Sequence, residues 1–496
     1  MIRIKNFSLL RWISLALILS AALILVYELI SFSRLRSGFS LGTTIADVPV
    51  GGLTLDEAAD RLTQAYSVPV ELHYNDAVIQ VKPATLGFSL DLNAMITAAD
   101  QKRSSSPFWS SFFNYLFNRY PDSSSVPLVA TINEDTLRDY LNSEIAPRYD
   151  QAPDAYSPVP GGTTFVAGQA GSVLNVDRSV QLVSMALRSP TSRIVNLSVD
   201  KVDSSKPSQE NLKVLLKQII DNSGFTGVAE IYLLDLQTQQ ELQLAYQQGE
   251  ELAPNIAFSA ASTIKVPIMV SVFKDAKKPI SSENTALLEE MIETSSNTAP
   301  DKLMQSVIDP NLAPVMITND LEALGLENIF LGGMFADGSA LLISPKTTAN
   351  QRTDINTNPD VYSQTTPADM GSLLDDIYQC AQNGGGTFAA VFPQQITQSD
   401  CRTMILYLTR NDQPGLLREG LPDGTQIAHK HGWVTDNTTD GLMHLVSDAG
   451  IVYTPGGNYI MAVYLADTRQ VVWDTANYLI ASLSRAVYNY YNLSAQ

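Results

Sequence analysis

The longest run of apolar residues lies near the N-terminus of the chain. Residues 12–27 are almost unbroken apolar, and the run extends to Phe32 with Glu28 as its only charged residue. This length approaches the roughly 20 residues that a helix needs to cross a bilayer. Three basic residues precede the run: Arg3, Lys5 and Arg11. Because basic residues stay in the cytoplasm, the sequence predicts a single-pass protein of the cell membrane, with a cytoplasmic N-terminus and an extracytoplasmic body.

The residues after this run decide between an anchor and a cleaved signal peptide. The chain continues as Ser33-Arg34-Leu35-Arg36, without a convincing small-residue cleavage site. A retained anchor over residues 1–36 is therefore favoured.

Short helical and strand-like patterns alternate between residues 37 and 202. Thr54 and Glu57 form a capping box that opens a helix, and alternating residues predict strands over 70–74 and 77–81. Residues 87–93 resemble residues 171–177, and each segment leads into a helical pattern. This echo indicates a duplicated strand–helix unit within a small α+β domain.

A polar stretch over residues 203–209 is typical of a linker, and residues 210–496 follow it with a different pattern. Apolar spacing predicts a helix around Leu212–Ile219 and a last helix over 473–490. Strands are predicted at both ends of this region, over 227–236, 241–246, 426–434, 442–453 and 459–466. Strands at both ends with helices between them predict an α+β fold, in which one antiparallel sheet is closed by the two ends of the domain.

Composition narrows the function. The chain has 51 acidic and 32 basic residues and a formal net charge of −19. An acidic surface repels phosphates, so nucleic acid is not an expected partner. The two cysteines, Cys380 and Cys401, are too few for a disulfide scaffold or a four-cysteine zinc site. In an exported domain they can form one bridge, and the alternative is two separate buried thiols.

Three short motifs carry the candidate chemistry. They are Ser262-Thr263-Ile264-Lys265, Ser295-Ser296-Asn297 and His429-Lys430-His431-Gly432. A serine three residues before a lysine places both side chains on one face of a helix. The order and spacing of the three motifs are typical of active-site-serine acyl transferases.

The chemistry of these residue types suggests a role for each. Ser262 is the expected nucleophile, and Lys265 is its nearest base if burial or a nearby cation lowers the pKa of the amine. Lys430 is that cation, Ser295 relays a proton to the leaving nitrogen, and Asn297 orients Lys265. The backbone N–H groups of Ser262 and Trp433 are the expected oxyanion hole. Gly432 leaves room for substrate against the strand.

On these motifs the region over roughly 225–490 resembles the class A β-lactamase and penicillin-binding superfamily. Two further stretches match it, Thr365–Met370 and Leu416–Pro422. The resemblance implies a sheet with terminal helices and a helical lobe. It also implies an acyl-enzyme reaction on β-lactam or cell-wall peptide amides, which needs no metal or cofactor.

Three departures from this family bear on the outcome of the reaction. His431 replaces a threonine that helps to bind substrate, and Ser296 replaces an aspartate. No Glu-x-x-Leu-Asn, which supplies the deacylating glutamate of the family, lies between Asn297 and Thr365. The acids nearest the expected spacing lack the right context: Glu322, Glu327 and Asp337. Without such a base an acyl-enzyme is expected to persist.

Histidines raise the alternative of a metal site. His429 and His431 share a face of the predicted strand, and His444 is a conceivable third ligand. No carboxylate or cysteine stands beside them in sequence, so structural or substrate-contact histidines are favoured.

The N-terminal region resembles the peptidoglycan-binding domain of cell-wall proteins of the vancomycin-resistance W type. The resemblance rests on Ala46–Thr54 with its helix and on the Leu86-Gly87 and Ala170-Gly171 turns. An aromatic cluster in this region can contact sugars, the membrane surface or the protein itself, and helical spacing favours a packed helix. Its members are Phe108, Trp109, Phe112, Phe113, Tyr115, Phe117 and Tyr120.

The sequence therefore predicts a membrane-anchored serine hydrolase that acts on β-lactams or cell-wall peptides. One alternative is a D,D-peptidase that β-lactams acylate slowly and irreversibly. The other is a silent module that holds peptidoglycan.

Overall fold

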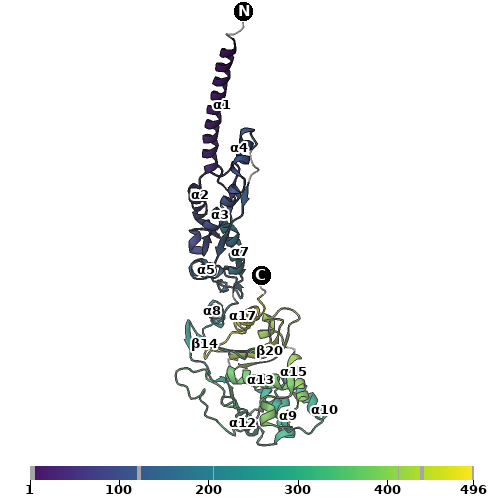
Figure 1. The fold of residues 1–496 in the computed structure, drawn as a ribbon. Coiled ribbons are helices and arrows are strands. Elements are labelled where there is room, and N and C mark those ends of the chain that lie inside the picture. Colours follow the sequence, from purple (N-terminus) through teal and green to yellow (C-terminus); the bar gives the residue numbers. More distant parts are fainter. Residues whose placement is uncertain (1–5, 120–123, 205, 412, 436–440, 494–496) are drawn as a thin grey trace, which may run out of the picture. The chain divides into compact units, whose positions relative to one another are not determined.

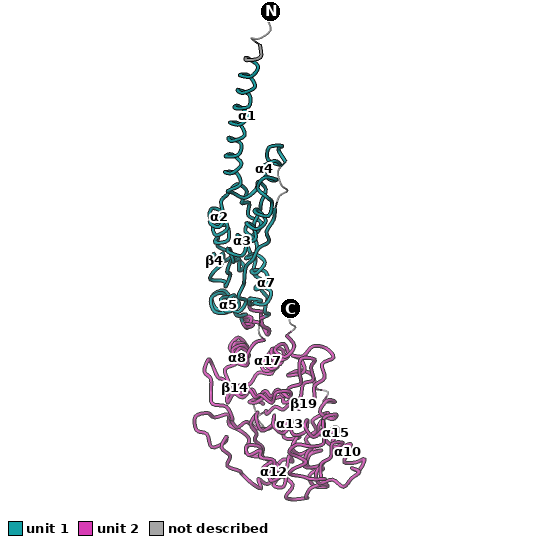
Figure 2. The backbone as a smooth tube through the Cα atoms, viewed as in Figure 1, with its two compact units in different colours: residues 1–154, 169–203 teal, residues 155–168, 204–496 magenta. Residues whose placement is uncertain are grey.

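The computed structural model describes residues 6–119, 124–204, 206–411, 413–435 and 441–493. It divides the chain into two compact units (Figure 2). Unit 1 comprises residues 1–154 and 169–203, and unit 2 comprises residues 155–168 and 204–496.

Unit 1 begins with the long apolar helix α1 (Asn6–Ser37), shown in purple in Figure 1. By length and composition, Leu10–Ser37 is able to cross a membrane. The other helices of the unit are α2 (Leu55–Ser67), α3 (Leu92–Ser104), α4 (Phe108–Leu116), α5 (Glu134–Tyr140), α6 (Ala146–Tyr149) and α7 (Val176–Leu187). Its strands are β1 (Thr44–Ile45), β2 (Val48–Pro49), β3 (Val70–Tyr74), β4 (Ala77–Val81), β5 (Phe88–Leu90), β6 (Ser125–Val126), β7 (Ala130–Ile132), β10 (Gly171–Leu174), β11 (Ile194–Asn196) and β12 (Val199–Val202).

The repeated sequence in unit 1 forms repeated structure. Strand β5 leads into α3 through Asp91, whose side chain accepts a hydrogen bond from the backbone N–H of Ala94. Strand β10 leads into α7 in the same way through Asn175. Thr54 and Glu57 also form the predicted capping box at the start of α2. These caps supply acceptors for backbone N–H groups that lack partners at a helix start.

Unit 2 contains a six-stranded antiparallel sheet in the order β15-β14-β13-β21-β20-β19. Its strands are β13 (Val228–Asp235), β14 (Glu241–Gln247), β15 (Glu250–Leu252), β19 (Gln426–Thr435), β20 (Met443–Tyr453) and β21 (Tyr459–Ala466). Strand β13 pairs with β21 from Val228↔Ala466 to Asp235↔Tyr459. The sheet is therefore closed by the two ends of the unit, and the predicted α+β class is confirmed.

Helices cover both faces of this sheet. Buried residues of α8 (Gln209–Ser223) and α17 (Trp473–Tyr491) form one apolar cluster with one face. A second cluster joins the other face to α9 (Lys265–Asp275), α10 (Ser282–Ile292), α12 (Ala313–Ala323), α13 (Pro367–Asn383) and α15 (Gln398–Thr409). The remaining helices are α11 (Ala299–Leu303), α14 (Thr387–Val391) and α16 (Leu416–Gly420). A small sheet of β16 (Phe258–Ser259), β18 (Ser363–Thr365) and β17 (Phe330–Leu331) lies beside them.

Residues 155–168 belong to unit 2, although the sequence placed them in the N-terminal domain. They form the hairpin β8 (Ser157–Pro158) and β9 (Phe165–Val166). Tyr156 and Phe165 are buried in the same apolar cluster as α8 and α17. The side chain of Asn489 also donates a hydrogen bond of 2.7 Å to the carbonyl of Thr163. Burial of the Tyr156 and Phe165 rings therefore holds residues 155–168 in unit 2.

Candidate active site

Ser262 and Lys265 lie on one short turn at the start of α9. Residues Ala261–Ile264 form a 3₁₀ turn, in which side chains three positions apart are aligned. Lys265 Nζ is accordingly 2.9 Å from Ser262 Oγ. Ala261 adopts a left-handed conformation, with φ of 48°. Such backbone strain in a residue other than glycine persists only where the surroundings hold it, as at active sites.

The second motif, Ser295-Ser296-Asn297, supplies further hydrogen-bond partners of Lys265. Lys265 Nζ donates hydrogen bonds to Ser295 O at 2.8 Å and to Asn297 Oδ1 at 2.8 Å. It is also 3.2 Å from Ser295 Oγ. Ser295 has a φ of 60°, in the loop between α10 and α11. Ser296 turns away and accepts hydrogen bonds from the backbone N–H groups at the start of α11.

The third motif lies on β19, which is an edge strand of the six-stranded sheet. Lys430 Nζ donates a hydrogen bond of 2.9 Å to Ser295 Oγ, so this hydroxyl lies between the two lysines. At Gly432, a β-carbon would lie 2.8 Å from the backbone nitrogen of Ser262. Only glycine therefore permits this approach of the strand to the serine turn. The structure brings all five predicted catalytic side chains together.

Burial controls the charge of both lysines. Lys265 and Lys430 are 0% exposed. Burial lowers the pKa of Lys265 to about 8. Burial, and then the nearby charge of Lys265, also lowers the pKa of Lys430, against a smaller opposing effect of Asp448. Because the hydrogen-bond partners of both ammonium groups in the described chain are hydroxyl, carbonyl and amide oxygens, the neutral amine becomes accessible near neutral pH.

The opposite face of β19 carries the histidines. His429 Nδ1 lies 3.0 Å from both carboxylate oxygens of Asp448, and these side chains are 1% and 0% exposed. His431 Nδ1 lies 3.0 Å from Asn411 Nδ2, and its ring stacks on Trp433. The His431 imidazole is thus directed away from the face that carries Lys430, because side chains alternate along a strand. Its expected contact with substrate stays a prediction.

This second face does not have the features of a metal site. His444 Nδ1 lies 3.1 Å from the carbonyl of Asp467. Within the described ranges, no group of three His, Cys, Asp or Glu side chains is arranged to hold a metal ion. A cavity of about 460 Å³ lies here, lined by His429, His431 and Trp433 among others. Burial, and then Lys430, lowers the pKa of His431 to about 3, which keeps its imidazole neutral.

Sequence reasoning missed the residue that covers Lys265. The ring of Phe335 lies 5.6 Å from Lys265 Nζ. Asp301, on α11, accepts hydrogen bonds of 2.8 Å from the backbone N–H groups of Phe335 and Ala336 and so holds this segment in place. At Gly333, a β-carbon would lie 2.8 Å from the carbonyl of Ala340, so the segment is tightly folded.

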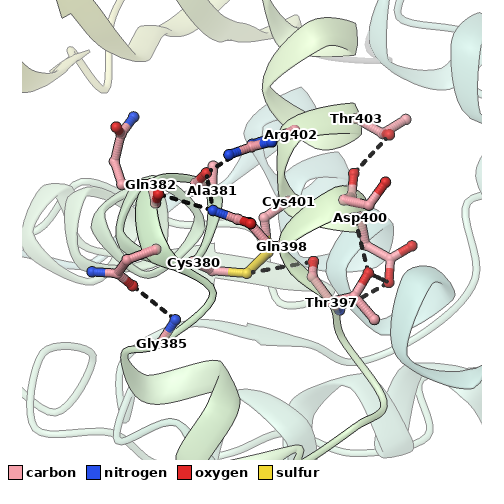
Figure 3. Close-up of a disulfide and its surroundings, with 12 residues drawn as sticks. Cys380, Ala381, Gln382, Gly385, Thr397, Gln398, Asp400, Cys401, Arg402 and Thr403 are labelled. Carbon is pink, nitrogen blue, oxygen red and sulfur yellow. Dashed lines mark hydrogen bonds between the residues drawn. A yellow bond between two sulfur atoms is a disulfide. The ribbon is translucent and has the colours of Figure 1, made fainter.

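The two cysteines form a disulfide between α13 and α15 (Figure 3). The side chains of α15 also hold the last turn of α13. Gln398 Nε2 donates a hydrogen bond of 2.9 Å to the carbonyl of Gln382, and Arg402 Nε donates one of 3.1 Å to the carbonyl of Ala381. The bridge therefore stabilises the helical lobe and takes no part in the site.

Comparison with known proteins identifies the family of unit 2. A model described as "Beta-lactamase enzyme family" matches residues 211–285 and 280–491. The chain belongs to this family. No curated protein matches the chain.

Several solved structures are similar to part of this chain. PBP-A is 21% identical over 57% of this chain and 98% of its own, with a TM-score of 0.40. TLA-1 extended-spectrum β-lactamase is 18% identical over 57% of this chain and 98% of its own, with a TM-score of 0.42. A class A β-lactamase representative from Bacteroides cellulosilyticus is 17% identical over 59% of this chain and 100% of its own, with a TM-score of 0.41.

Proposed function

We propose that the chain is a membrane-anchored serine hydrolase that forms an acyl-enzyme at Ser262 with β-lactams or cell-wall peptide amides. The observation that carries the proposal is the contact of 2.9 Å between Ser262 Oγ and the buried amine of Lys265. A hydroxyl needs a base at this distance to become a nucleophile, and a lysine with a pKa near 8 is such a base.

The reaction follows from the positions of the side chains. Lys265 accepts the proton of Ser262 Oγ while this oxygen attacks the carbonyl carbon of the amide. The backbone N–H groups of Ser262 and Trp433 receive the oxyanion. Ser295, between Lys265 and Lys430, passes a proton to the leaving nitrogen, and the C–N bond breaks. The acyl group remains on Ser262 until water or an amine attacks it.

The rest of the chain is proposed to keep this chemistry at the cell wall. Helix α1 is the proposed anchor, since Leu10–Ser37 is long and apolar enough to cross a membrane. Residues 37–154 and 169–202 are proposed to bind peptidoglycan, on the motifs in Ala46–Thr54 and at the two glycine turns. The catalytic unit would then act outside the cytoplasm.

One observation favours a slow second half-reaction, as in a D,D-peptidase or another penicillin-binding enzyme. Phe335 occupies the space over Lys265, and the hydrogen-bond partners of Lys265 in the described chain are Ser262, Ser295 and Asn297. An apolar ring cannot accept a proton from water, so it cannot serve as the deacylating base. We therefore expect β-lactam acyl-enzymes of this protein to be long-lived.

Labelling with a fluorescent penicillin tests the proposal. The full chain in detergent is incubated with the reagent and then chased with unlabelled penicillin. We expect stable label on the parent protein and none on Ser262→Ala, because no other hydroxyl contacts Lys265 from the same turn. Ser282→Ala, an exposed serine at the start of α10, is the matched control and is expected to label fully.

Each outcome of the chase has a separate meaning. Label that depends on Ser262 and is lost quickly would establish a β-lactamase and reject the slow second half-reaction. Label that persists would establish a penicillin-binding enzyme. Equal labelling of the parent and Ser262→Ala would refute Ser262 as the nucleophile.

A further inference from the structure

A second cavity, of about 500 Å³, lies in unit 1 at the last turns of α1. Its walls come from the end of α1, the chain that follows it, the end of α3 and one side of α4. The proposed catalytic reaction makes no use of it.

The polar part of this cavity is cationic. Four basic side chains line it: Arg36, Lys102, Arg103 and Arg119. No carboxylate is among its described lining residues, although Asp100 binds Arg103 from one side. This is unusual in a chain with a net charge of −19, and it makes the cavity a site for an anion.

Two of these arginines, Arg36 and Arg119, have N–H groups without a hydrogen-bond acceptor in the described chain. Arg36 donates one hydrogen bond of 2.9 Å to the carbonyl of Ser106, but its Nη1 is buried without a partner in the described chain. Arg119 is exposed, and its guanidinium group has no hydrogen-bond or ion-pair partner among the described residues. A buried N–H without an acceptor is costly, so an occupant with several acceptor oxygens would satisfy the site. Guanidinium groups match the oxygens of a phosphate in this way.

The apolar part of the cavity continues onto α1. Phe32 and Leu35 line the cavity, and α1 exposes apolar side chains over the span that precedes them. Tyr115, on α4, donates a hydrogen bond of 2.9 Å to Glu28, the only charged residue within the apolar run. The site therefore joins a cationic pocket to the surface that is proposed to face lipid.

The exposed side of α4 supports a position of this site at the surface of a bilayer. As the spacing predicted, Phe108, Phe112 and Tyr115 pack around Phe32. The other side of the segment exposes Trp109, Phe113 and Phe117, at 62%, 58% and 73%, whereas Tyr120 lies outside the described residues. Exposed aromatic rings beside the end of a membrane-spanning helix are typical of the membrane–water interface. Figure 1 shows α4 beside the end of α1.

We propose that this cavity binds the phosphate group of a membrane lipid. Arg36 and Arg119 would hold the phosphate oxygens, and the acyl chains would lie along α1 and the exposed rings of α4. The proposal rests on the membrane anchoring proposed above and is independent of the acyl-enzyme chemistry. A soluble phosphate ester offers the same oxygens, so the test must separate the two sources.

Titration of the full chain in phosphate-free detergent micelles tests this proposal. Native mass spectrometry follows the binding of short-chain phosphatidylglycerol, short-chain phosphatidylcholine and glycerol 3-phosphate. We expect the anionic lipid to bind tightest. Loss of one charge-assisted contact in Arg119→Gln or Arg36→Gln should weaken it about tenfold. Arg61→Gln, an exposed arginine on α2, is the control and should not change the affinity.

The outcomes separate the alternatives. Glycerol 3-phosphate binding as tightly as the lipid would overturn the lipid assignment in favour of a soluble phosphate ester. Equal binding of both lipids, unchanged in Arg119→Gln, would overturn the cationic site altogether. Arg119→Gln is informative even if Arg36→Gln fails to fold, because Arg119 is exposed. Fluorescent-penicillin labelling of the same samples reports the acyl-enzyme proposal separately.

Discussion

The two faces of β19 bury ionisable side chains in opposite ways. On one face, Lys430 and the neighbouring Lys265 have neutral hydrogen-bond partners in the described chain. On the other face, His429 lies against the carboxylate of Asp448. Burial opposes ionisation of Asp448, but the contacts with His429, together with His431 and the backbone N–H of Leu417, outweigh it and keep the pKa of this carboxyl below its usual range.

We infer from this difference that one strand serves both the proposed reaction and the stability of unit 2. A buried amine without a carboxylate among its hydrogen-bond partners loses its proton easily, which allows it to act as a base. A buried carboxylate with a histidine partner and the backbone N–H of Leu417 keeps its charge and holds structure in place. We therefore expect substitutions on the lysine face to change rates and substitutions on the histidine face to change stability.

The largest effect is expected at Lys265. Lys265→Gln keeps a polar side chain with some hydrogen bonding, although it is one atom shorter, and removes the base. The acylation rate constant should fall about 10²- to 10⁴-fold, as for the loss of a general base. Stopped-flow fluorescence with a chromogenic or fluorescent β-lactam measures it. Lys346→Gln, an exposed lysine of the same unit, is the control and should acylate normally.

The pH dependence of acylation sharpens this assignment. Only the neutral amine accepts a proton, and the pKa of Lys265 is lowered to about 8. The acylation rate constant should therefore rise with pH, by about tenfold per unit below this pKa, and level off above it. A rate that is constant between about pH 6 and pH 8 would contradict Lys265 as the base.

The strands of the sheet and the convergence of the three motifs could be predicted because both depend on local sequence patterns. Strands over 70–74, 77–81 and 459–466 appear with the predicted bounds. Alternation along β19 also predicted that His429 and His431 share one face of the strand. By contrast, β16 and β17 have only two residues each, which is too short for any periodicity.

The position of Phe335 over Lys265 could not be predicted from the sequence, for a different reason. The position of Phe335 depends on the hydrogen bonds from the backbone N–H groups of Phe335 and Ala336 to Asp301. No pattern in residues 332–338 indicates this contact. Residues 155–168 were misplaced for a similar reason, since Tyr156 and Phe165 pack against helices distant in the sequence. Long-range contacts between single side chains leave no periodic trace.

A smaller effect is expected at Phe335. Phe335→Glu places a carboxylate near the acyl group, where it can activate water. Hydrolysis of the penicillin acyl-enzyme should become at least about tenfold faster, followed as loss of label during the chase. Acylation should slow, because the new charge raises the pKa of Lys265. Phe335→Leu keeps the site apolar and should not accelerate hydrolysis, so equal rates in both variants would argue against a missing base.

The smallest effect on rate, with a clear effect on stability, is expected at Asp448. Asp448→Asn removes the buried carboxylate that contacts His429 Nδ1 and the backbone N–H of Leu417, and should lower the free energy of unfolding of unit 2 by about 3 kcal/mol. Loss of penicillin labelling in a urea series measures this. Asp423→Asn, an exposed acid of the same unit, is the control. Because the folded pKa of Asp448 lies below its usual 3.8, this stabilisation is present above that pH and is lost as the pH falls through the folded value.

The pH profile of this variant separates the two lysines. Asp448 opposes the lowering of the pKa of Lys430, whereas no such contribution is seen at Lys265. Removing the carboxylate should therefore lower the pKa of Lys430 further and leave that of Lys265 in place. If Lys265 is the base, the midpoint of the acylation profile stays near pH 8 in Asp448→Asn. A midpoint that moves to lower pH would indicate that Lys430 is the base. It would also show that a substitution on the histidine face of β19 changes the rate, contrary to the separation expected above.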